Sequence, residues 1–172
     1  MRFYADKKKN LDKLFEKVES RYFSDNPIRL AKIMYCFWEG DQKQADGRLK
    51  IGEARILSLR ERDLYGYDFL ISVDADIWKG LSLTDKIRLA VHELNHCIVV
   101  AAIVKEEWIP KEDSEGRIKI KLKKHDVNVN VFRYEIETCG LYDGERKTLT
   151  NTLEWDRQAL VRDKASKKKK KQ

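Results

Sequence analysis

Three residues near the middle of the chain, His92, Glu93 and His96, have the types and the spacing of a metal-dependent hydrolytic site. On a helix, residues four apart project from adjacent turns of one face, so two imidazoles at this spacing can reach one metal ion. Glu93 lies about 100° around the helix from His92, where its carboxylate can take a proton from a water on that ion. This HExxH arrangement predicts a Zn²⁺ site with Glu93 as the general base.

A catalytic zinc takes three protein ligands and keeps one position open for water. The one histidine outside the motif, His125, is the predicted third ligand. Asp126 and Glu135 are the alternatives for this position, because zinc also accepts carboxylate oxygen. The other interpretation of His92 and His96 is an exposed pair on a helix surface, with an incidental glutamate beside it.

The segment that carries the motif has the pattern of an amphipathic helix from about residue 83 to residue 99. Ser82, followed three residues later by Asp85, resembles a capping box at its start. Val91 and Leu94 should pack inward, which leaves the two histidines at the margin of the packed face, where a cleft can form. Apolar residues recur at spacings of three and four: Ile87, Ala90, Val91, Leu94, Ile98 and Ala101.

The sequence outside this motif predicts both helices and strands. The segment from His125 to Gly140 is ambiguous, because its valines alternate as in a strand, but Asp126 and Gly140 at its two ends favour a helix. The predicted helices besides that of the motif span residues 10–23, 27–37, 127–139 and 150–166.

Two segments rich in β-formers, 53–61 and 66–78, could pair as neighbouring strands, and the second could be covered on both faces. They come after a predicted loop at 40–50. A hairpin is expected between 101–110 and 117–123, around the turn-like sequence KEDSEG.

The length of 172 residues fits a single domain, expected at 1–163, with a disordered Lys-rich tail at 164–172. The six lysines of the tail supply most of the net charge of +7. The tail therefore serves either as a solubilising segment or as a weak, salt-dependent contact with nucleic acid.

The composition excludes several classes of protein. No apolar run reaches the roughly 18 residues of a membrane span, and no secretory signal is recognised, so we expect a cytoplasmic protein without a membrane partner. Cys36, Cys97 and Cys139 form no CxxC pair and are expected to be reduced core residues.

Three segments together resemble the phage metallopeptidase family, whose members are zincin-like and distantly similar to SprT-like proteases. The resemblance covers about residues 26–141 and rests on GYDFLISVDADIW, LSLTDKIRLAVHELNHC and KLKKHDVNVNVFRYEIETCGL. It implies a zincin-like α+β fold, in which a small mixed or antiparallel sheet packs on the HExxH helix with flanking helices. It also implies zinc held by His92, His96 and His125, Glu93 as general base, and a phage or prophage origin, hence the host cytoplasm.

These features support two functional hypotheses. In the first, the protein is a zinc metallopeptidase that cleaves a protein or peptide substrate with a metal-activated water. In the second, the chain is a catalytically silent binding module on a zincin scaffold, which holds a structural zinc and engages DNA or a host protein.

Overall fold

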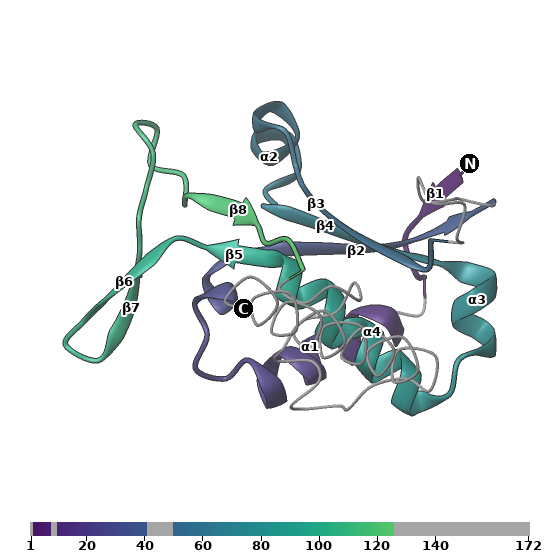
Figure 1. Ribbon diagram of the computed structural model, residues 1–172. Coiled ribbons are helices and arrows are strands. Elements are labelled where there is room, and N and C mark those ends of the chain that lie inside the picture. Colours follow the sequence, from purple (N-terminus) through teal and green to yellow (C-terminus); the bar gives the residue numbers. More distant parts are fainter. Residues whose placement is uncertain (1, 8–9, 41–49, 126–172) are drawn as a thin grey trace, which may run out of the picture. The chain divides into compact units, whose positions relative to one another are not determined.

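The computed structural model describes residues 2–7, 10–40 and 50–125 (Figure 1). All of its elements lie in one compact unit, Met1–Lys124, and His125 is the described residue of a second unit, His125–Gln172. Helices and small sheets alternate along the chain, which confirms the α+β class. The elements are β1 (Arg2–Tyr4), α1 (Asn10–Tyr22), the 3-10 helix η1 (Pro27–Leu30), β2 (Ile33–Glu39), β3 (Gly52–Ile56), α2 (Leu59–Tyr65), β4 (Phe69–Asp74), α3 (Ala75–Gly80), α4 (Leu83–His96), β5 (Cys97–Val99), β6 (Ala101–Val104), β7 (Glu107–Pro110) and β8 (Ile120–Leu122).

The main sheet has four strands in the order β1-β2-β4-β3. β2 and β4 are parallel, whereas β1 and β3 are antiparallel to their neighbours, so the sheet is mixed. Every residue of β4 is buried, as expected for an inner strand covered on both faces. The predicted pairing of β3 with β4 is confirmed, with Gly52 opposite Val73.

Two helices, α1 and α4, pack against each other and lie along one face of this sheet (Figure 1). The predicted helix at 10–23 is confirmed as α1, whose Leu11, Phe15 and Val18 are buried at spacings of four and three. The ring of Phe15 lies 4.7 Å from that of Tyr35 on β2. This contact helps to fix α1, and through it α4, against the sheet.

The predicted helix at 27–37 is wrong beyond its first turn. Asn26 does act as an N-cap, since its side chain accepts a hydrogen bond from the backbone of Ile28, but the turn ends at Ala31. The chain then forms β2, which pairs with β4 from Ile33 to Trp38. Cap residues indicate only where a helix can begin, whereas the long-range pairing with a buried strand decides whether the helix continues.

The two predicted strands at 53–61 and 66–78 are both too long. Ser58 and Glu61 form a capping box that begins α2, a helix that was not predicted from the sequence. The second strand ends at Asp74, whose carboxylate accepts hydrogen bonds from the backbone of Asp76 and Ile77 and so begins α3.

The predicted hairpin is wrong in its pairing. β6 pairs with β7 through a two-residue turn at Lys105 and Glu106, and both turn residues have positive φ values. Such a turn matches the twist of the strands but usually contains Gly or Asn, which this turn lacks. β8 pairs instead with β5, and residues 113–116 form a small turn next to the bridge between Glu112 and Ile118.

The helix at 83–99 is confirmed as α4 except for its end, because Cys97–Val99 leave the helix as β5. Cys36 and Cys97 are buried and free, as predicted. The described residues include no helix that is long and apolar enough to cross a membrane. Outside the described residues lie Cys139, most of the predicted loop at 40–50, the helices at 127–139 and 150–166, and the boundary at 163.

Candidate metal centre

α4 presents His92 and His96 side by side. Ser82 accepts a hydrogen bond from the backbone of Asp85 and so fixes the start of the helix. Val91 and Leu94 are fully buried, as predicted, while both histidines are half-buried at the margin of this face. Their ring centroids are 5.1 Å apart, at an interplanar angle of 76°.

The chain returns to the end of α4 through the pairing of β5 with β8. Cys97, the residue after His96, lies opposite Leu122 in this ladder. One residue further, the backbone N–H of Lys123 donates to the carbonyl of His96 at 2.8 Å. This ladder therefore directs the chain towards the end of α4, which carries His92 and His96, just before His125.

The three histidines form a cluster that could hold a metal ion. Each offers one ring nitrogen, and these nitrogens lie within 4.8 Å of one another. Ligand nitrogens around a tetrahedral zinc are roughly 3.3 Å apart, since each Zn–N bond is about 2.0–2.1 Å long. The observed separations allow the three imidazoles to converge on one ion after small side-chain movements.

The orientation of His96 fits metal binding as well. Its Nδ1 lies 2.8 Å from the carbonyl oxygen of Lys123. A carbonyl can only accept, so Nδ1 carries the proton and Nε2 keeps the lone pair that a metal ligand requires. The backbone of Lys123 therefore selects the tautomer that can bind a metal through Nε2.

Glu93 is buried, with 3% of its surface exposed. Its carboxylate packs against the backbone of β3 at Gly52 and beside Leu89. A charged side chain held in this way has few alternative positions, which suits a group that must meet a water at a fixed place.

Cys97 comes directly after His96 but is not a suitable ligand. Burial raises the pKa of its thiol far above the ordinary value, and the charge of Glu93 adds to the effect. Zinc binds the thiolate form, which this environment disfavours. The thiol instead points to the backbone carbonyl of Glu93, at 3.7 Å.

The predicted set of His92, His96 and His125 is thus brought together, and Glu93 lies on the same helix as His92 and His96. Asp126 and Glu135, the alternative third ligands, lie outside the described residues. Two contributors, Lys123 and Gly52, were not predicted from the sequence. Lys123 acts through its backbone and leaves no signal in the sequence, whereas a glycine inside a strand is itself a sign of close approach.

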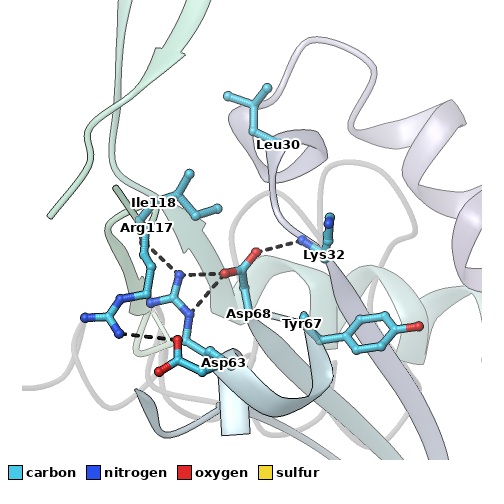
Figure 2. Close-up of a pocket in the computed structure, with 9 residues that line it drawn as sticks. Leu30, Lys32, Asp63, Tyr67, Asp68, Arg117 and Ile118 are labelled. Carbon is cyan, nitrogen blue, oxygen red and sulfur yellow. Dashed lines mark hydrogen bonds and ion pairs between the residues drawn. The ribbon is translucent and has the colours of Figure 1, made fainter. Parts of the chain in front are cut away.

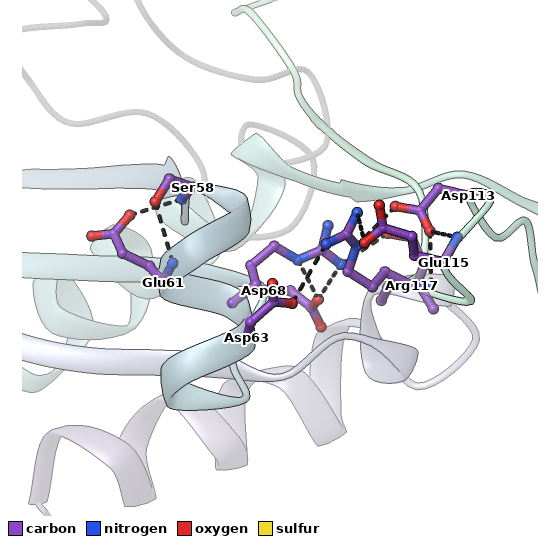
Figure 3. A network of polar contacts seen from close by, with 9 residues as sticks. Ser58, Glu61, Asp63, Asp68, Asp113, Glu115 and Arg117 are labelled. Carbon is purple, nitrogen blue, oxygen red and sulfur yellow. Dashed lines mark hydrogen bonds and ion pairs between the residues drawn. The ribbon is translucent and has the colours of Figure 1, made fainter.

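A separate pocket lies between α2 and the segment before β8 (Figure 2). Arg62 forms a partly buried ion pair with Asp68, at 2.6 Å, and also donates to the carbonyl of Ile118. Arg117 pairs with Asp63, Asp113 and Glu115 (Figure 3). Because both guanidinium groups are already engaged by carboxylates, the pocket is better explained as a structural clamp than as an anion site.

Comparison with known proteins gives one match. A family model described as "Putative phage metallopeptidase" matches residues 3–170. No curated protein and no solved structure matches the chain.

Proposed function

The chain belongs to the phage metallopeptidase family, and on this basis we propose that it is a zinc-dependent peptidase with a zincin-like fold and with Glu93 as its general base. The observation that carries the proposal is the clustering of the ring nitrogens of His92, His96 and His125 within 4.8 Å, together with the buried Glu93 on the same helix as two of them.

The donor set favours zinc over harder cations. Three neutral imidazoles suit Zn²⁺, whereas Mg²⁺ and Ca²⁺ prefer carboxylate and carbonyl oxygen. Bound here, Zn²⁺ would supply a Lewis acid that lowers the pKa of a water towards about 7 and polarises the substrate carbonyl.

Glu93 would carry the protons of the reaction. Its carboxylate takes a proton from the attacking water and later delivers one to the nitrogen of the leaving amine. His92, His96 and His125 would hold the metal ion, and the hydrogen bond from His96 to the carbonyl of Lys123 keeps one imidazole oriented.

The edge strand β3 offers a place for the substrate backbone to bind. The backbone N–H of Asp74 donates to Ile51, and that of Leu57 donates to Asp68, so Gly52, Ala54 and Ile56 direct their own N–H and C=O groups away from β4. No described strand forms a ladder with this outer edge. An extended peptide could add there, beside the carboxylate of Glu93.

The test is hydrolysis of an unstructured protein, such as fluorescently labelled casein, by the zinc-loaded chain. We expect the parent to cleave it and Glu93→Gln to be at least about 100-fold slower with one zinc per chain retained. Glu107→Gln, a change at an exposed carboxylate on β7, should match the parent.

Equal rates for Glu93→Gln and the parent would refute the role of Glu93. A zinc-loaded parent that cleaves no substrate, but loses its fold in His92→Ala, would instead support the catalytically silent binding module with a structural metal.

A further inference from the structure

We propose that Gly52 is a positioning residue for the general base, because the absence of a side chain at this point of β3 provides the space that the carboxylate of Glu93 occupies. The catalytic part of this inference rests on the proposed function, whereas the contact itself does not.

The steric evidence is direct. A Cβ atom at position 52 would lie 2.9 Å from Cδ of Glu93 and 3.1 Å from Cδ1 of Leu89, and it would overlap with Oε1 of Glu93. Cβ contacts shorter than 3.0 Å are essentially never found in proteins. Even alanine at this position would therefore require a neighbour to move.

The backbone conformation does not explain the glycine. Gly66 and Gly116 have φ values of 70° and 76°, in the left-handed region, and a Cβ atom at either would meet nothing within 4 Å. Gly52 differs from both in these two properties. It is not among the glycines with positive φ, and a Cβ atom there would meet three atoms within 3.1 Å. A glycine in a strand weakens the strand, so the close approach of Glu93 is the physical reason for a glycine at this position.

Of the two sides of this contact, the glutamate side chain should yield first. β3 is held to β4 in register from Gly52 to Ile56, and the N–H of Asp74 donates to Ile51 at 2.8 Å, immediately before Gly52. The carboxylate, in contrast, is the far end of a flexible side chain. A methyl group at position 52 should therefore displace the carboxylate rather than the strand, while the metal ligands stay in place.

The first measurement compares zinc-loaded Gly52→Ala with the parent. We expect kcat to fall about 10- to 100-fold, because a displacement of about 1 Å can cost this much, while KM changes less than about threefold and one zinc per chain is retained. Gly80→Ala is the matched control, since a Cβ atom there meets nothing within 4 Å, and it should leave kcat and KM unchanged.

The second measurement needs no catalysis. Gly52→Ala should lower the melting temperature by about 2–4 °C in the parent, but by less than half as much when Glu93→Ala has removed the carboxylate. A parent without peptidase activity would refute the proposed function and leave this coupling as the test of the contact. The inference is overturned if the two temperature shifts are equal, if kcat stays within about twofold of the parent, or if zinc is lost together with activity.

Discussion

At the scale of single residues, the proposed site depends on backbone atoms as much as on side chains. The carbonyl of Lys123 orients His96, and the bare backbone of Gly52 makes room for Glu93. The side chain of Lys123 takes no part in either contact, so its identity should matter little, whereas each imidazole would supply a ligand nitrogen of the proposed site.

Replacement of His125 tests this distinction. His125→Ala should lower zinc affinity by more than the roughly 10- to 100-fold that the loss of an outer hydrogen-bond partner costs. Lys123→Ala keeps the carbonyl that His96 requires and should bind zinc like the parent. Competition with a chromophoric chelator measures both affinities, and equal affinities for His125→Ala and the parent would exclude His125 as a ligand.

At the scale of elements, local signals predicted helices α1 and α4, whereas long-range pairing decided where β2 and β8 form. The spacing in α1 and the cap of α4 are encoded within a few residues, so both helices were predicted. β2 was predicted as a helix because its partner β4 lies more than 30 residues away along the chain. The spacing of His92 and His96, and the presence of a single further histidine, predicted the cluster, whereas the contacts of Gly52 and Lys123 depend on how β3 and β8 pack.

The clamp between α2 and the segment before β8 should support the metal site. Arg62 and Asp68 expose only 10% and 15% of their side chains, and Arg62 also holds Ile118, two residues before β8. Arg62→Ala leaves Asp68 without this partner and should lower the free energy of unfolding by on the order of 3 kcal/mol. It should also weaken zinc binding, because β8 leads to Lys123 and His125.

Chemical denaturation and zinc titration measure these two effects. Lys79→Ala is the control, since its ion pair with Asp76 is largely exposed and should contribute nothing measurable. An Arg62→Ala protein as stable as Lys79→Ala would contradict the clamp.

The stabilisation that Glu61 provides at the start of α2 should depend on pH. Hydrogen bonds from Arg55, and then from Ser58, lower the pKa of Glu61 from 4.5 to about 2. Because the folded-state pKa lies below the unfolded value, the stabilisation is complete above about pH 4.5 and is lost as the pH falls to about 2.

Glu61→Gln keeps a capping-box residue but removes the ion pair. Its melting temperature should lie below that of the parent at pH 7, and the difference should disappear near pH 2. A difference that stays constant over this range would contradict the assignment.

At the scale of the whole molecule, charge is distributed unevenly along the sequence. Six lysines lie within residues 164–172, whereas residues 1–163 are nearly neutral. If the tail binds nucleic acid, its deletion should leave zinc content and peptide hydrolysis unchanged and abolish DNA binding. In the full chain, a plot of the logarithm of the DNA-binding constant against the logarithm of the salt concentration should then have a slope no steeper than about −5. The limit follows because at most six phosphates are neutralised.

Fluorescence anisotropy with labelled duplex DNA measures this slope. Unchanged DNA affinity and salt dependence after the deletion would show that the tail is not the contact.

The central claim, that three histidines hold one metal beside a carboxylate that stays outside its coordination, is tested most directly by diffraction from zinc-loaded crystals at the zinc absorption edge. We predict one anomalous peak at about 2.0–2.1 Å from a ring nitrogen of each of His92, His96 and His125, with Glu93 not coordinated. A peak remote from these histidines, or one ligated by Glu93 in place of His125, would contradict the account.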